Sequence, residues 1–157
     1  MTPKQLAEYY IAIANTTGDL LTNLKLQKLV YYTQAWHLAF FDKPIFDDDF
    51  QAWVHGPVLA DLYHQFKEFR WEPIKSELGE TELKVFNESM NGNIKEIVND
   101  VILKYYYTLT AYQLELSTHN EDPWKNARKG LAIDDSSEKV IEKNDIKSFY
   151  RKFIVEN

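Results

Sequence analysis

The stretch LKLQKLVYYTQAWHLAFF, residues Leu24 to Phe41, decides the fold. At about 100° per residue, its apolar side chains fall on two faces of one helix. A helix that is apolar on two faces is packed by neighbours on both sides, so we expect residues 24–41 at the centre of the fold. The same stretch contains two Lys, two Gln and one His, which makes it a poor membrane span. One face carries Leu26, Leu29, Val30, Trp36 and Phe40, and the other carries Leu24, Tyr31, Ala35 and Leu38, with Gln27 and Gln34 between them.

The length and composition are those of one domain. The chain has 157 residues, of which 45% are hydrophobic and 15% aromatic, enough to bury a core. We find no repeat and no Gly/Ser linker, and therefore expect residues 1–157 to form a single domain.

The charge and the cysteine count exclude several functions. There are 18 Lys and Arg against 24 Asp and Glu, a net charge of -6. This argues against nucleic-acid binding, which depends on clustered cations, and suits a basic partner. No cysteine is present, so disulfides and thiolate catalysis are excluded. The start MTPKQLAEYY lacks the features of a signal peptide, so we expect a cytoplasmic protein with no membrane association.

Around the central helix, the sequence predicts a mainly α (α+β) fold, a helical bundle with a small antiparallel β element. A capping box at Thr2 predicts a first helix to about Asn15. Residues 50–54 alternate as a strand does, and Gly56-Pro57 has the form of a helix start. Further helices are predicted over 57–69, 94–109, 111–119, 123–130 and 145–156. A short strand is predicted over 83–86, and extended pieces at Ile133 and 139–144. The predicted helix caps are Thr22 or Asn23, Asn93, Thr110, Asp122 and Asn144.

The histidines do not form a catalytic or metal motif. His55 and His64 lack the i, i+4 spacing of helical zinc ligands, and a cap explains Asp122 near His119. His37 fits a core histidine. There is no G-x-S-x-G elbow and no glycine-rich phosphate loop, and the acidic run 47–49 lacks the spacing of a calcium loop. We therefore expect no enzyme, no metal site and no cofactor.

Tryptophan and tyrosine are more numerous than a small core requires, and both are favoured anchors at protein interfaces. We interpret Trp36 as core. Trp53 shares a strand face with His55, which favours an outward position. Trp53 and Tyr63 flank the Gly56-Pro57 corner and are the first candidates for contact with a partner.

Two blocks of the sequence resemble one family. LTNLKLQKLVYYTQAWHLAFFDKPIFDDDFQAWVHGPVLADLYHQFK, residues 21–67, and LSTHNEDPWKNAR, residues 116–128, are similar to the two signatures of the Panacea domain. This is the SocA-like antitoxin domain, also found in phage-associated GepA-like proteins. The resemblance implies a type II antitoxin that binds and neutralises a cognate protein toxin encoded nearby. It also implies that the motif residues serve the fold and the interface, with His55 and His119 hydrogen-bonding into the corner. The partner-binding candidates are Trp53, His55, Tyr63, His119 and Trp124.

Two other classes remain open from the sequence. One is a DNA-binding autorepressor of its own operon, and the only sequence feature that favours it is the short basic segment FYRKF. The other is a metal-dependent enzyme built on His55, His119 and Asp122. The sequence leaves the oligomeric state and the identity of the toxin open.

Overall fold

The computed structural model describes residues 1–154, and these contain eight α-helices and one two-stranded antiparallel sheet. The predicted mainly α class with a small β element is thus confirmed. The helices are α1 Pro3–Thr17, α2 Asn23–Phe41, α3 Ala60–Phe66, α4 Glu80–Ser89, α5 Gly92–Ile97, α6 Ala111–His119, α7 Asp122–Ala127 and α8 Lys143–Arg151. The strands are β1 Gln51–Trp53 and β2 Gly56–Val58, a 3₁₀ turn η1 spans Lys67–Phe69, and a π-helical segment η2 spans Val98–Tyr106.

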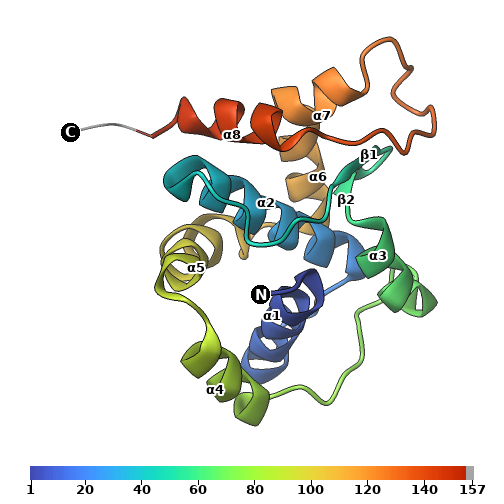
Figure 1. Cartoon of the computed structure of the whole chain (residues 1–157). Helices are drawn as coiled ribbons and strands as arrows, with labels where there is room; N and C mark the ends of the chain where they lie inside the picture. The colour runs from blue at the N-terminus through green and yellow to red at the C-terminus, as the bar shows by residue number, and fades with distance from the viewer. Residues whose placement is uncertain (155–157) are drawn as a thin grey trace.

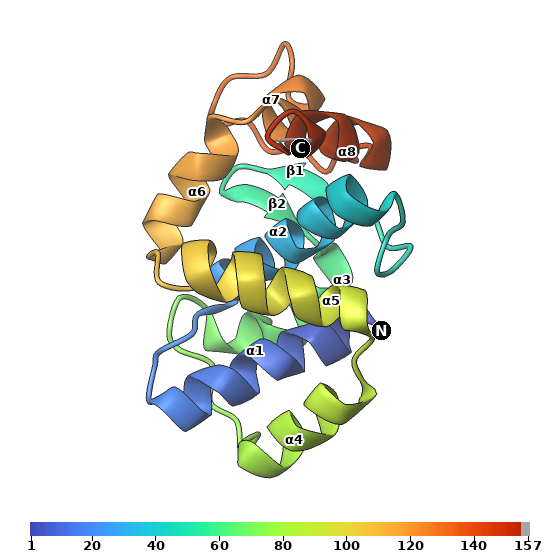
Figure 2. The same ribbon diagram turned by 90° about the vertical axis from the view of Figure 1, so that its left-hand side faces the viewer.

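The helix α2 is the centre of the fold, as its two apolar faces predict. Figure 1 shows it crossing the middle of the molecule between α8 on one side and α1 on the other. In the view of Figure 2 the elements lie in layers, from α7 and α8 through the hairpin and α2 to α5, α1 and α4. Leu29 and Val30 are fully buried, and Tyr31 packs edge-on against Tyr150 of α8 with ring centroids 6.4 Å apart. Phe40 is an exception to the predicted face, because 46% of its surface is exposed at the end of the helix.

The polar residues between the two faces of α2 hold neighbouring backbone. Gln27 accepts a hydrogen bond from the Leu59 amide at 3.1 Å. Gln34 donates to the Phe46 carbonyl at 2.8 Å and accepts from the Ile45 amide at 2.7 Å. Buried polar groups need such partners, and here Gln34 fixes the loop that leads from α2 to the hairpin, while Gln27 fixes the start of α3 after it.

The predicted helix start at Gly56-Pro57 is wrong. Residues 56–58 form β2, which pairs antiparallel with β1, and α3 begins only at Ala60. Pro57 stands opposite Ala52, whose amide and carbonyl both point away from β2. They bond instead to Lys139, at 2.9 Å, and to Arg128, at 2.8 Å. The missing N–H of Pro57 therefore costs the ladder no hydrogen bond.

The predicted strand at 83–86 is also wrong, because these residues lie within α4. The Gly79 amide donates to the Glu82 carboxylate at 2.8 Å and caps the helix start. Leu83 and Phe86, three residues apart, then share one face, from which Phe86 meets Tyr9 of α1 edge-on at 6.2 Å.

Three of the predicted helix caps are correct. Thr2, Thr22 and Thr110 each accept a hydrogen bond from an amide in the first turn of their helices. Three other predicted caps are wrong: Asn91 replaces Asn93, and Glu121 and Glu142 occupy the positions predicted for Asp122 and Asn144. Val140 forms a single bridge with Gln51, whereas Ile133 lies in a turn region without a strand. The last helix ends at Arg151, and the end of its predicted range falls outside the described residues.

Candidate partner-binding site

The β1–β2 hairpin is held against α2 and α6 at Gly56. Its φ of +107° is a conformation that favours glycine, and a Cβ atom there would lie 2.5 Å from Cε of Lys28 and 2.8 Å from Oγ1 of Thr118. Lys28 is fully buried in α2 and donates from Nζ to the Pro57 carbonyl at 3.2 Å. Glycine is thus required twice at this corner, by its backbone angle and by the close approach of two side chains.

A second group of side chains holds the hairpin from α7. The indole N–H of Trp124 donates to the Trp53 carbonyl at 2.8 Å, and the His119 ring stacks on Trp124 with centroids 4.0 Å apart and planes 15° apart. Arg128 covers the other side, with its guanidinium 5.0 Å from the Trp124 ring centroid. Trp124 is buried, so it supports the hairpin from behind and does not present a surface.

Arg128 is a buried cation that bonds to backbone carbonyls. It donates to Ala52 of β1 at 2.8 Å, to Ala132 at 3.2 Å and to Asp135. These contacts tie the segment 129–139 to the hairpin, so that this segment has a fixed position beside it. Sequence reasoning missed this role, although Arg128 stands at the end of the second quoted block.

Beside the hairpin lies a cleft of about 690 Å³, which we call the hairpin cleft. This volume lies in the range of sites that enclose drug-sized ligands. Its walls come from the hairpin, from the α3–η1 segment and the turn after it, from α6 and from the 129–139 segment. The lining residues are Leu24, Trp53, Val54, His55, Val58, Tyr63, Lys67, Arg70, Trp71, Glu115, Ser136, Ser137 and Glu138.

Three of the five partner-binding candidates line this cleft. Trp53 and Tyr63 meet edge-on with ring centroids 5.0 Å apart, and His55 stands at the hairpin tip with 68% of its side chain exposed. His119 and Trp124 do not line it and lie behind the hairpin instead. Trp53 is half-buried rather than free in solvent, because one side of its ring packs on Tyr63.

Charge at the cleft centres on Glu115 of α6. Its carboxylate lies 2.7 Å from Nδ1 of His55 and 3.9 Å from Nε2 of His119. Burial lowers the pKa of His119, an effect that Glu115 partly offsets. Burial likewise lowers the pKa of Lys28 to about 7, against the opposing influence of Glu115. The Nε2 atom of His119 is buried with no hydrogen-bond partner among residues 1–154.

The described part of the chain offers no cluster of three or more His, Cys, Asp or Glu side chains that could hold a metal ion. The Asp122 carboxylate lies 3.9 Å from the Lys152 ammonium. None of the helices within residues 1–154 has both the length and the apolar character needed to span a membrane.

Comparison with known proteins gives one match. A family model described as Antitoxin SocA-like, Panacea domain, matches residues 26–125, almost two thirds of the chain. This span runs from α2 through the hairpin to α7 and includes Lys28, Thr118 and Trp124, whereas Arg128 lies just beyond its end. No curated protein and no solved structure matches.

Proposed function

We propose that this chain, which belongs to the SocA-like Panacea antitoxin family, is the antitoxin of a type II toxin–antitoxin system in a bacterium or phage and neutralises its toxin by direct contact at the hairpin cleft. The observation that carries the proposal is the family match over residues 26–125. We further propose that residues 1–157 act as one domain in the cytoplasm.

The cleft supports contact as the mode of action. It brings together aromatic side chains from the hairpin and from α3, two elements that the family match covers. Trp and Tyr in partly enclosed positions are the residues that most often dominate binding energy at protein interfaces. Trp53 and Tyr63 are therefore the proposed anchors, with His55 at the rim.

The arrangement of the histidines also favours binding over catalysis. A nucleophilic enzyme needs a hydroxyl within hydrogen-bond reach of its base. Among residues 1–154, the histidine ring nitrogens bond to the Lys43 carbonyl and the Glu115 carboxylate, and no serine or threonine hydroxyl bonds to one. His55 and His119 face Glu115, a contact that orients the rings at the corner.

The test is co-expression with the product of the neighbouring gene in cells that this product kills or arrests. The wild-type chain should restore growth, and the two proteins should co-purify. Trp53→Ala and Tyr63→Ala should restore growth less well while keeping the circular dichroism spectrum of the wild type. Tyr105→Ala is a matched control, because Tyr105 is an aromatic side chain that is 67% exposed on η2 and does not line the cleft.

Failure of the wild-type chain both to protect cells and to co-purify would refute direct neutralisation. Loss of protection by Tyr105→Ala to the same extent as by Trp53→Ala would instead show that the hairpin cleft is not the contact surface.

A further inference from the structure

The chain from Phe69 to Glu72 forms a tight turn with an unusual residue in it. The Glu72 amide donates to the Phe69 carbonyl at 2.9 Å, and Arg70 has φ +53° and ψ -120°. These angles are those of the first central position of a type II′ turn, which glycine normally occupies. An arginine in this position is strained, and such strain is retained chiefly where a side chain has a function.

The next residue of the turn is also unusual. Trp71 is 80% exposed, although burial of an indole is strongly favoured. Both Arg70 and Trp71 line the hairpin cleft. The turn thus places a cation and an exposed indole side by side at the edge of an aromatic cleft.

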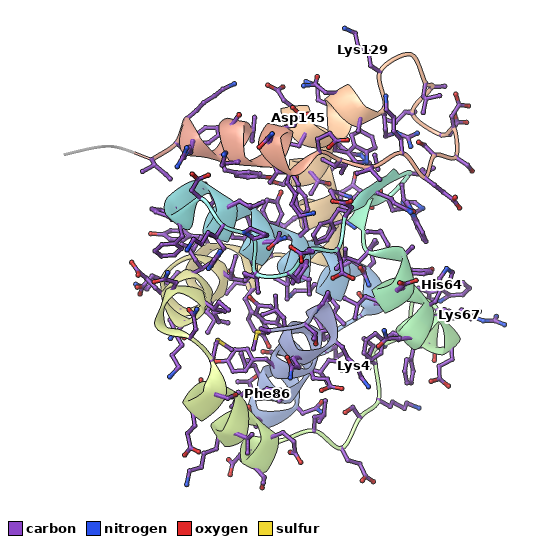
Figure 3. All side chains as sticks on the ribbon, in the orientation of Figure 1. Lys4, His64, Lys67, Phe86, Lys129 and Asp145 are labelled. Carbon is purple, nitrogen blue, oxygen red and sulfur yellow. The ribbon has the colours of Figure 1, made fainter. Side chains whose placement is uncertain are left out.

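Lys67 adds a second cation to this edge. It lines the same cleft, and Figure 3 shows it on the outer side of the α3–η1 segment near His64. Within residues 1–154, neither Lys67 nor Arg70 takes part in an ion pair or a side-chain hydrogen bond. By contrast, Glu115 on the facing wall is already paired with His55. The edge formed by Lys67 and Arg70 is therefore positive, although Glu138 on the 129–139 segment also lines the cleft without an ion pair among residues 1–154 and the whole chain is acidic.

We propose that the Arg70–Trp71 turn is a recognition element that selects an extended segment of the partner protein carrying an apolar or aromatic side chain next to a carboxylate. The apolar side chain packs between Trp71 and the Trp53–Tyr63 pair, and the carboxylate bonds to Arg70 and Lys67. This inference rests on the proposed function, since it names the chemistry of the toxin segment that the cleft accepts.

The charges favour a peptide over a nucleic acid as the occupant. A polyanion is repelled by a chain with a net charge of -6, and nucleic-acid affinity needs many more cations than the two at this edge. One carboxylate is matched by the planar fork of a single arginine, whose two parallel hydrogen bonds also fix its orientation. The cleft volume of about 690 Å³ suits a few residues of an extended chain and excludes a folded domain.

The probe is a displayed library of random seven-residue peptides, selected on the immobilised full chain. The wild type should enrich sequences with Asp or Glu adjacent to Leu, Ile, Phe, Tyr or Trp. The most enriched peptide, made synthetically, should bind Arg70→Gly at least about tenfold more weakly than the wild type. Arg70→Gly is a clean variant because glycine fits this turn position, so a loss of affinity reports the missing side chain.

Lys67→Ala and Trp71→Ala should also weaken binding of the same peptide. Lys84→Ala on α4, an exposed lysine outside the cleft, should leave it unchanged. The proposal is overturned if selection enriches no motif, enriches basic or uncharged motifs, or enriches acidic motifs that bind Arg70→Gly as tightly as the wild type.

The co-expression assay separates this inference from the proposed function. If wild type and Arg70→Gly/Lys67→Ala protect cells equally, neutralisation holds and the recognition element is refuted. If the wild type itself does not protect, the proposed function fails, whatever the library enriches.

Discussion

Replacing Gly56 by alanine tests the packing of the hairpin corner most directly. The new Cβ would stand 2.5 Å from Cε of Lys28 and 2.8 Å from Oγ1 of Thr118, and the backbone would keep a φ of +107°. The conformation alone costs a non-glycine residue about 1–2 kcal/mol. Overpacking adds about 1–3 kcal/mol where neighbours cannot move. Lys28 is held by its bond to Pro57, and Thr118 by its bond to the Glu115 carbonyl, so both should resist displacement.

The control is Gly130→Ala, because Gly130 has a similar φ of +88° but no atom within 4 Å of its ideal Cβ position. Gly130→Ala should therefore lose only the conformational part, about 1–2 kcal/mol, whereas Gly56→Ala should lose about 2–5 kcal/mol in all. Equilibrium urea unfolding followed by far-ultraviolet circular dichroism gives both free energies. If the losses in the two variants agree within about 0.5 kcal/mol, which is the usual scatter between independent sites, Lys28 and Thr118 move aside for the new methyl group and the packing argument is wrong.

Three further predictions follow from buried or strained groups. Burial lowers the pKa of Lys28 from 10.5 to about 7. Between these two pH values the unfolded chain binds more protons than the folded chain, so the free energy of unfolding should rise with pH. The rise should be on the order of a few kcal/mol in urea titrations at several pH values, and Lys28→Met should abolish most of it. Burial raises the pKa of Glu121 from 4.5 to about 7, despite hydrogen bonds from Tyr32 and Tyr150. The free energy of unfolding should therefore fall as pH rises from 4.5 to about 7, and Glu121→Gln should remove this fall. If Lys28→Met or Glu121→Gln keeps the pH profile of the wild type, the replaced side chain is not the group responsible. Arg70→Gly should raise stability by about 1 kcal/mol, because relief of strain exceeds the extra entropy of glycine in the unfolded chain, and a lower melting temperature would show that Arg70 is not strained.

The features of the fold that the sequence predicted are those set by local spacing. The two apolar faces of α2 require packing partners on both sides, whichever segments of the chain supply them, and α1 and α8 pack against these faces. Thr2 and Thr110 begin their helices with capping boxes that close within four residues. Such signals are independent of the rest of the chain, and they were correct.

The errors arose where distant residues decide the local structure. Gly56-Pro57 has the local form of a helix start, but Arg128 and Lys139 take the hydrogen bonds of Ala52 and make Pro57 acceptable in a strand. Leu83 to Phe86 contains alternating apolar residues, and contact with α1 favours the helical alternative. Trp53, His55 and Tyr63, which the sequence predicts as partner contacts, line the cleft. The sequence did not predict the roles of Lys28 and Arg128. A lysine or arginine is expected at the surface, and only the structure shows the buried backbone carbonyls to which these two side chains bond.

The residues around the hairpin fall into two sets, one that supports it and one that is exposed at the cleft. Lys28, Thr118 and Arg128 lie behind the hairpin and fix its position through contacts with Gly56, Pro57 and Ala52, and a substitution that broke these contacts would lower stability. His55 and the Arg70–Trp71 turn lie in front of it, on a hairpin tip and a tight turn, where side chains touch little of the core. Binding residues placed on short loops over a rigid support can change without loss of the fold. Under the proposed function, the residues behind the hairpin preserve the cleft, and the residues at its edge select the toxin segment.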